Sequence, residues 1–264
     1  MKNILFFGGG NIAQSVIEGL IKSGYKRNNI FFIDRNTKNK KKLEKLKIKE
    51  FSKDKKDQIS FFFLCVKPKD ALSSFKEIKQ LKKNAKVISF VAGIKSNKYI
   101  KIDETTKFMR AMPNTSSRYG LGITALFNST FSIEDKKLIN KLFNKVGMVI
   151  ELNKEIEMDQ FTGLVGSGPA YFFYILKAYE KELLKMCSDD NRKVNEIMVN
   201  LLKGVSMSIK NNNDLDELVT MVASKKGTTE AGLDSFKKNK LNKYFKDGLR
   251  SAVKRSKEIS NEFK

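Results

Sequence analysis

Over the first half of the chain, short apolar runs alternate with amphipathic segments. An apolar run of about four to eight residues is typical of a buried strand, and apolar positions three or four residues apart are typical of a helix face. Alternation of the two predicts a doubly wound parallel α/β sheet. Strands are expected at residues 3–7, 30–33, 59–66, 86–92, 106–111, 121–127 and 147–151, and helices at residues 12–21, 38–49, 70–81 and 132–145.

The pattern changes after residue 152, beyond which we find only helical patterns. The longest of them cover residues 168–186, 191–210 and 241–260. The sequence therefore predicts two domains: an α/β domain over residues 1–153, followed by an all-helical domain over residues 154–264.

The first of these long helices is aromatic on several sides. Its aromatic residues are Tyr171, Phe172, Phe173, Tyr174 and Tyr179. Aromatic residues all round a helix indicate burial from both sides, which suits either a subunit interface or an ordinary core helix.

Composition excludes several kinds of chemistry. The 264-residue chain has no histidine and two cysteines, Cys65 and Cys187. Without histidine there is no Ser-His-Asp triad, no Cys-His dyad and no His-ligated zinc, and two cysteines are too few for a four-cysteine metal site. We therefore expect no bound metal. Two cysteines without a spacing motif also predict a reducing compartment and no disulfide framework.

The chain is strongly basic, with 52 Lys and Arg against 29 Asp and Glu and a formal net charge of +23. Because the lysines are spread along the whole length, a bias in surface composition explains this charge better than nucleic-acid binding does. The N-terminal apolar stretch is too short for a signal peptide, and the run from Phe61 to Val66 is far shorter than the about 20 residues of a membrane span. We expect a cytoplasmic protein with neither nucleic acid nor membrane as a partner.

A glycine-rich turn separates the first strand from the first helix. Residues 8–13 read G-x-G-x-x-A. In this motif Gly8 permits the tight turn, Gly10 lets a pyrophosphate approach the backbone, and Ala13 lets the helix pack closely on the sheet. The first helical residues, Asn11 and Ile12, offer free N–H groups to the phosphates. The motif predicts dinucleotide binding, the alternative being a glycine turn without a ligand.

The end of the second strand bears on the choice between NADH and NADPH. Asp34 stands where an acid commonly binds the adenosine ribose, and it would repel a 2′-phosphate. Arg35 follows and can accept that phosphate. The lysines between residues 38 and 42 either raise the local potential or form a solvated helix face. These residues leave the preference open.

Four further segments complete a recognisable order along the chain. They are Val66-Lys67-Pro68, Arg110-Ala111-Met112-Pro113-Asn114-Thr115, Gly166-Ser167-Gly168-Pro169-Ala170-Tyr171 and Ser224-Lys225-Lys226-Gly227-Thr228-Thr229-Glu230. With the glycine turn these segments span nearly the whole chain. In all five segments together, the sequence closely resembles the pyrroline-5-carboxylate reductases. The resemblance implies a Rossmann domain followed by a helical dimerisation domain, and a homodimer or an assembly of such dimers. It also implies reduction of 1-pyrroline-5-carboxylate to L-proline by NADPH or NADH.

The resemblance assigns roles to individual residues. Val66, Lys67 and Pro68 would line the nicotinamide-ribose side of the cofactor, although Lys67 could be a plain surface lysine. The wall beside the nicotinamide would consist of Met112, Pro113 and Asn114. The active site would lie between the cofactor of one subunit and a loop of the helical domain, with helices of the partner subunit completing it.

That loop would bind the substrate. Gly227, Thr228 and Thr229 would hold the substrate carboxylate, Ser224 would help to order the loop, and Thr229, or a water that it orients, is the candidate proton donor. Backbone N–H groups at a helix start and threonine hydroxyls suit a carboxylate, while simple N-capping by Thr228 or Thr229 is the alternative. The family usually has Ser-Pro-Gly-Gly where this chain has Ser-Lys-Lys-Gly. The loop therefore lacks the restraint of proline and the freedom of one glycine, whereas its added cations could attract an anionic substrate.

The expected chemistry suits a chain without histidine. The iminium carbon of a protonated cyclic imine is already electrophilic, so the reaction needs a well-placed hydride donor more than a strong general acid. A 2-hydroxyacid dehydrogenase must move a hydroxyl proton, which disfavours that activity here. A reductase of a six-membered cyclic imine acid and a non-catalytic NAD(P)-binding regulator remain as alternatives.

Overall fold

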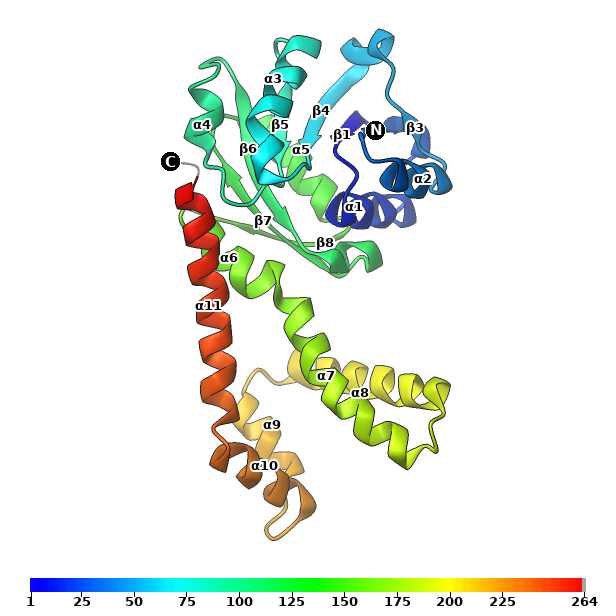
Figure 1. The fold of residues 1–264 in the computed structure, drawn as a ribbon, viewed down its shortest axis with the longest axis vertical. Coiled ribbons are helices and arrows are strands. Elements are labelled where there is room, and N and C mark those ends of the chain that lie inside the picture. The colour runs from blue at the N-terminus through cyan, green and yellow to red at the C-terminus, as the bar shows by residue number, and fades with distance from the viewer. Residues whose placement is uncertain (263–264) are drawn as a thin grey trace. The chain divides into compact units, whose positions relative to one another are not determined.

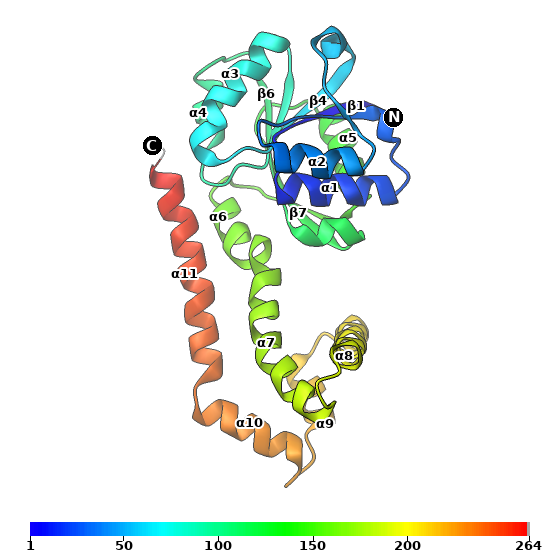
Figure 2. The ribbon, with the colours of Figure 1, turned by 45° about the vertical axis from the view of Figure 1, so that its right-hand side comes forward.

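The computed structural model describes residues 1–262 (Figures 1 and 2). The chain forms two compact units. One contains residues 1–169 together with the described residues from Ser251 onwards, and the other contains Ala170–Arg250.

The first unit is built on an eight-stranded sheet in the order β3-β2-β1-β4-β5-β6-β7-β8. All neighbours from β3 to β6 in this order are parallel. The strands are β1 (Asn3–Phe7), β2 (Ile30–Ile33), β3 (Lys49–Glu50), β4 (Ile59–Leu64), β5 (Lys86–Ser89), β6 (Lys107–Pro113), β7 (Gly122–Asn128) and β8 (Gly147–Glu151). The sheet helices are α1 (Asn11–Lys22), α2 (Thr37–Lys45), α3 (Ala71–Leu81), α4 (Ser96–Ile100) and α5 (Ile133–Phe143), joined by the 3-10 turns η1 (Arg27–Asn29), η2 (Lys53–Gln58), η3 (Pro68–Asp70) and η4 (Thr115–Tyr119).

The sequence pattern predicts a parallel sheet, and the observed sheet is mostly but not entirely parallel. β7 runs antiparallel to β6, and β8 runs parallel to β7. The connection from Pro113 to Gly122 holds only the short turn η4, and a parallel crossover needs a dozen or more residues. The chain therefore reverses after β6, while α5 supplies the crossover that returns β8 parallel to β7.

Three other predicted boundaries are wrong. The helix expected at 38–49 ends at Lys45, because Lys47 adopts a positive φ of 58° and Lys49–Glu50 pairs with β2. The strand expected at 59–66 ends at Leu64. The strand expected at 86–92 likewise ends earlier, at Ser89. In both cases the residues that follow the strand leave the sheet.

Apolar side chains fill both faces of the sheet, as a doubly wound fold requires. Alternate residues of β1 point to opposite sides: Phe6 packs with α1 and α5, and Leu5 packs with α3 and α4. Phe6 and Phe63 stack with ring centroids 4.8 Å apart on the first side, and Tyr99 stacks on Phe108 at 4.3 Å on the second. These layers fix the carboxyl ends of the strands, where the candidate site lies.

The first unit continues beyond the sheet. α6 (Glu157–Phe161) is followed by a π-helical segment, Thr162–Gly166, and by the start of α7 (Gly168–Met186). The end of α11 (Leu241–Glu262) packs against this segment. Within that contact the buried carboxylate of Asp159 accepts hydrogen bonds from Ser256 Oγ at 2.9 Å and from Ser260 Oγ at 2.8 Å. A Cβ on Gly163 would lie 2.7 Å from the Val253 nitrogen, so glycine permits the close approach.

The second unit is helical. It holds the rest of α7, α8 (Asn191–Asn211), α9 (Leu215–Val222), α10 (Thr228–Lys238) and the start of α11. No strand occurs between residue 155 and residue 262, as predicted.

The aromatic residues of α7 are largely solvent-exposed in the single chain. Phe172 is 62% exposed, Phe173 66% and Tyr174 80%. The interpretation of α7 as an ordinary core helix is therefore wrong for these residues, and the interpretation as a subunit interface stays a prediction.

Candidate cofactor and substrate sites

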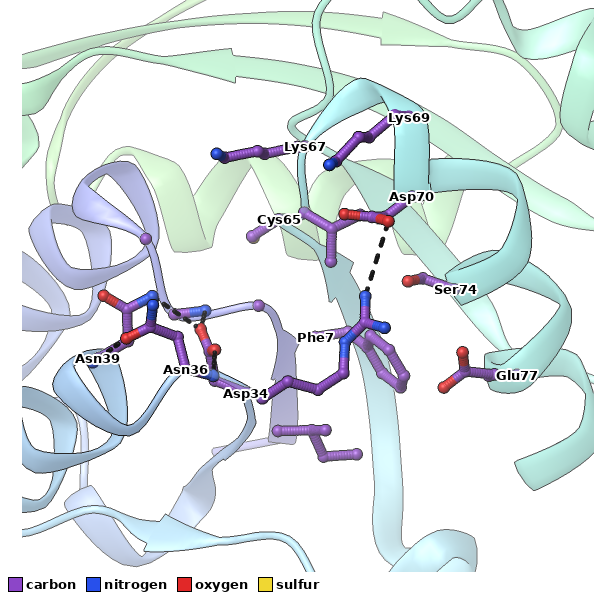
Figure 3. A pocket seen from close by; sticks show the side chains of 16 residues that line it. Phe7, Asp34, Asn36, Asn39, Cys65, Lys67, Lys69, Asp70, Ser74 and Glu77 are labelled. Carbon is purple, nitrogen blue, oxygen red and sulfur yellow. Dashed lines mark hydrogen bonds and ion pairs between the residues drawn. The ribbon is translucent and has the colours of Figure 1, made fainter.

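A cleft of about 360 Å³ opens at the carboxyl ends of β1, β2 and β4 (Figure 3). From β1 the chain leads outward to β2 and β3, and β4 begins the opposite half of the sheet. Ligands of open α/β sheets bind at such a switch point. The cleft is lined by Phe7, Gly8, Gly9, Gly10, Ile33, Asp34, Arg35, Asn36, Asn39, Cys65, Val66, Lys67, Lys69, Asp70, Ser74 and Glu77.

The first two glycines of the turn are required by the fold itself. Gly8 has a φ of 101°, and a Cβ there would lie 2.6 Å from the Cys65 carbonyl oxygen. A Cβ on Gly9 would collide with Leu43 and lie 3.0 Å from Asp34 Oδ2. The Gly8 nitrogen donates to the Ile33 oxygen at 2.8 Å, which ties the turn to β2.

Gly10 is different, because nothing in the protein demands it. Its φ is −68°, and a Cβ would have no neighbour within 4 Å. Gly10 is the N-cap of α1, no side chain caps this helix, and its first turn has no acidic residue. The open space and the free first-turn N–H groups fit a pyrophosphate, because a helix N-terminus attracts anions.

The Asp34 carboxylate is held by protein donors on both oxygens. Oδ2 accepts from the Gly9 nitrogen at 2.6 Å and from Asn39 Nδ2 at 3.0 Å, and Oδ1 accepts from the Asn36 nitrogen at 2.6 Å. Asn36 in turn caps α2 by accepting from Lys38 N at 2.9 Å. These contacts draw the carboxylate back toward the glycine turn, as Figure 3 shows.

Arg35 reaches across the cleft instead of folding onto its own strand. Its guanidinium lies 3.7 Å from Asp70 Oδ1, and its side chain is 79% exposed (Figure 3). An exposed pair at this distance is weak, so the guanidinium is available to a stronger anion. Lys67 and Lys69 lie on the same rim and add positive charge.

Cys65 contributes the sulfur atom of the cleft. Desolvation raises the pKa of its thiol well above the usual range. The thiol therefore stays protonated at neutral pH and is a poor nucleophile, because the thiolate is the reactive form.

The remaining predicted cofactor residues do not line this cleft. Asn11 and Ile12 occupy the first turn of α1, and Pro68 begins η3. The three residues of the predicted nicotinamide wall, Met112, Pro113 and Asn114, are buried at and just after the end of β6.

Protein contacts hold this predicted wall rigidly. Asn114 Oδ1 accepts from the Ile123 nitrogen at 3.1 Å, and Met112 packs in a cluster with Met158 and Phe161. The wall is thus fixed by the β6–β7 reversal and by α6.

The predicted substrate residues lie in the second unit, at the start of α10. Gly227 is the N-cap of this helix, and Thr228 and Thr229 are its first residues. No side chain caps the helix, so the alternative of N-capping by Thr228 or Thr229 is wrong. Ser224 is the first residue of the turn that leads into the helix. Its backbone carbonyl oxygen accepts a hydrogen bond from the Gly227 nitrogen at 3.0 Å.

Several residues of the cleft were not predicted from the sequence. Asn36 and Asn39 hold Asp34, Asp70 pairs with Arg35, and Ser74 and Glu77 come from α3. Asn36 was identifiable, since an Asn between a strand and a lysine-rich amphipathic run is a common N-cap. Asp70 was not, because its contact with Arg35 depends on how β4 and α3 fold back beside β2.

The described part of the chain has neither a metal-binding cluster nor a membrane-spanning helix. Residues 1–262 contain no group of three or more metal-ligating side chains that could hold an ion. Nor does any helix within that range have the length and apolar character needed to cross a bilayer.

Known proteins are similar to this chain over nearly its full length. A family model for pyrroline-5-carboxylate reductase dimerisation matches residues 155–259, and a model for coenzyme F420-dependent NADP oxidoreductases matches residues 3–93. The pyrroline-5-carboxylate reductase of Staphylococcus aureus (strain COL) is 33% identical over 269 residues, or 98% of each chain.

Solved structures agree with the fold. The pyrroline-5-carboxylate reductase of Coxiella burnetii superposes with a TM-score of 0.81 at 29% identity, covering 98% of both chains. The pyrroline carboxylate reductase of Plasmodium falciparum, crystallised with NADP bound, gives a TM-score of 0.86 at 23% identity over 98% of both chains, which shows the shared fold.

Proposed function

The chain belongs to the pyrroline-5-carboxylate reductase family, and we propose that it reduces 1-pyrroline-5-carboxylate to L-proline with NADPH as its preferred hydride donor. The observation that carries this proposal is the pairing of a full-length family match with a glycine turn whose third glycine serves no purpose within the protein. Space over Gly10 is what a bound pyrophosphate needs.

The first unit would hold the cofactor. Gly10 and the first-turn N–H groups of Asn11 and Ile12 would bind the pyrophosphate, and Val66 and Lys67 would lie along the nicotinamide ribose. Pro68 would lie on the same side of the cofactor, and Met112, Pro113 and Asn114 would form the wall beside the nicotinamide. When bound, NAD(P)H supplies the hydride for the C=N carbon.

The preference for NADPH is supported by two neighbouring side chains. Asp34 already accepts three hydrogen bonds from the protein, which offset its negative charge and occupy the oxygens that a ribose hydroxyl would use. Arg35 has only a weak, exposed partner in Asp70. A 2′-phosphate is a better partner for this guanidinium, because it accepts charge-assisted hydrogen bonds.

The second unit would hold the substrate. Gly227, Thr228 and Thr229 would bind the carboxylate through the backbone N–H groups of Thr228 and Thr229 and the two threonine hydroxyls. The N–H of Gly227 closes the turn on the Ser224 carbonyl oxygen, and Ser224 would order that turn. Thr229, directly or through an oriented water, would give a proton to the ring nitrogen. An iminium carbon needs little further activation, so the absence of histidine is no obstacle.

The assembly and location of the protein follow from the same family. We infer a homodimer, or an assembly of such dimers, that uses the exposed aromatic face of α7 and the helical region from residue 154 onward. We infer a cytoplasmic enzyme that functions without nucleic acid or membrane.

The test is a spectrophotometric assay of reduced nicotinamide oxidation. NADPH and NADH are each offered with 1-pyrroline-5-carboxylate and with its six-membered homologue. Faster turnover of the five-membered ring with NADPH is expected. One methylene changes binding by only about 1–3 kcal/mol, so some activity on the larger ring is also expected. Cofactor binding without oxidation of either imine would instead favour a non-catalytic NAD(P)-binding protein.

A further inference from the structure

The turn that leads into α10 contains a strained lysine. Residues 224–227 form a turn closed by the bond from the Gly227 nitrogen to the Ser224 oxygen. Lys226, the third residue of the turn, has a φ of 60°. A turn with positive φ at its third position normally takes Gly or Asn there and often Pro at the second position. Here both positions are lysine, so the residues themselves do not favour the turn.

The turn leaves little room for relaxation. A Cβ on Gly227 would collide with Ser224 Oγ and lie 3.0 Å from the Ser224 oxygen. The chain must therefore pass close to Ser224 before the helix begins. If Lys226 relaxed to a negative φ, this closure would be lost and the N–H groups at the start of α10 would no longer share one direction.

Glu230 supplies the restraint that the turn residues lack. Its Oε2 accepts a hydrogen bond from the Lys226 nitrogen at 2.6 Å. Glu230 lies in the first turn of α10, where a negative charge is favoured by the helix dipole. The bond thus joins the strained residue to the rigid helix that follows it.

Substrate binding alone does not account for this acid. A carboxylate so close to Thr228 and Thr229 would by itself repel an anionic substrate. Its bond to the backbone of Lys226 gives it a different task, and the cationic side chains of Lys225 and Lys226 belong to the same short segment.

We propose that Glu230 is a positioning residue, which holds the turn at residues 224–227 in its left-handed form and so presents residues 227–229 to the substrate carboxylate. The proposal rests on the proposed function for its substrate, but not for its structural part. Glu230 acts through Lys226 and does not itself contact the substrate.

A double-mutant cycle between Glu230 and Lys226 tests this role. Glu230→Ala removes the acceptor, Glu230→Gln keeps an uncharged one, and Lys226→Gly removes the strain. Asp234→Asn is the matched control, because Asp234 lies on the same helix and has only an exposed pair with Lys237 at 3.5 Å. Each variant is measured in the full-length protein by hydrogen exchange of the amides at 226–229 and by steady-state kinetics.

The expected results separate the restraint from general stability. Glu230→Ala should speed exchange of the Lys226 amide and raise KM for 1-pyrroline-5-carboxylate, each by about fivefold, the size of a lost helix cap. The Kd for NADPH should stay at the wild-type value. Glu230→Gln should fall between wild type and Glu230→Ala. Lys226→Gly should restore most of the loss in the double variant, and Asp234→Asn should match wild type.

Two outcomes would overturn the proposal. If exchange at 226–229 is the same in Glu230→Ala and wild type, Glu230 does not hold the turn. If exchange rises but KM does not, the turn does not serve the substrate. An enzyme that reduces no imine at all would refute the proposed function, while the exchange data would still decide whether Glu230 restrains Lys226.

Discussion

Replacing Gly8 or Gly10 of the glycine turn by alanine should have different consequences. Gly8→Ala should lower the stability of the fold, and Gly10→Ala should weaken cofactor binding. Gly8→Ala forces an L side chain into a φ of 101° and places its Cβ 2.6 Å from the Cys65 oxygen. A left-handed conformation costs about 1–2 kcal/mol, and the contact adds to it. We expect at least about 2 kcal/mol of lost stability, or a melting temperature lower by about 4–8 °C.

Gly10→Ala should leave the fold nearly intact. Its φ of −68° suits any residue, and the new Cβ meets no atom within 4 Å. Alanine is a poorer N-cap than glycine by up to about 1 kcal/mol. The methyl group would, however, keep the pyrophosphate away from the helix N-terminus. Losing two charge-assisted hydrogen bonds, at about 1.5–3 kcal/mol each, weakens NADPH binding by at least about 100-fold.

Calorimetric titration with NADPH and thermal melts of the same samples measure both effects. Gly248→Ala is the control, because that helical glycine also has open space around it and lies outside the cleft. If Gly10→Ala binds NADPH within about threefold of wild type, the pyrophosphate does not lie over Gly10. A Gly8→Ala variant as stable as wild type would show that the turn is not strained.

Three further outcomes are expected. Arg35→Ala should weaken the binding of NADPH by about 10-fold or more and leave the binding of NADH unchanged in titrations. Asp70→Asn should strengthen NADPH binding by up to about fivefold. Equal effects on the binding of both cofactors would refute the role of Arg35 in binding the 2′-phosphate. The ion pair with Lys79 lowers the pKa of the Asp103 carboxyl to about 2. Asp103→Asn should therefore have a lower melting temperature than wild type at pH 7, and the difference in melting temperature should disappear as the pH falls from about 4 toward 2. A difference that persists at pH 2 would contradict this. Phe173→Glu should give a monomer by light scattering, and a dimer of unchanged affinity would place the interface elsewhere.

Most strands of the sheet and the glycine turn could be predicted from the sequence because their signals are local. The run ISFFFLCV can only be a central strand, and G-x-G-x-x-A between a strand and a helix has one common use. The reversal after β6 was missed because strand patterns carry no direction. Only the short connection from Pro113 to Gly122 reveals it.

Other features of the site depend on contacts that local patterns do not encode. The hydrogen bond from the Gly9 nitrogen to Asp34 joins the segments that follow β1 and β2. The Arg35–Asp70 ion pair joins the end of β2 to the turn before α3. Lysine at position 226 gives no local signal of a positive φ, and only the family's glycine at this place in the loop pointed to one. In our proposal, Glu230, four residues further along the chain, holds the backbone of Lys226 in this conformation and so offsets the loss of the family's glycine.

Tracing the hydride shows whether the protein transfers it from NADPH to the imine carbon. The protein is incubated with 1-pyrroline-5-carboxylate and NADPH that carries deuterium at the transferable position of the nicotinamide, and the product is analysed by mass spectrometry and NMR. We expect L-proline with one deuterium on the carbon that was double-bonded to nitrogen, formed in equal amount to the cofactor consumed. Proline without deuterium, or cofactor bound but never oxidised, would contradict it.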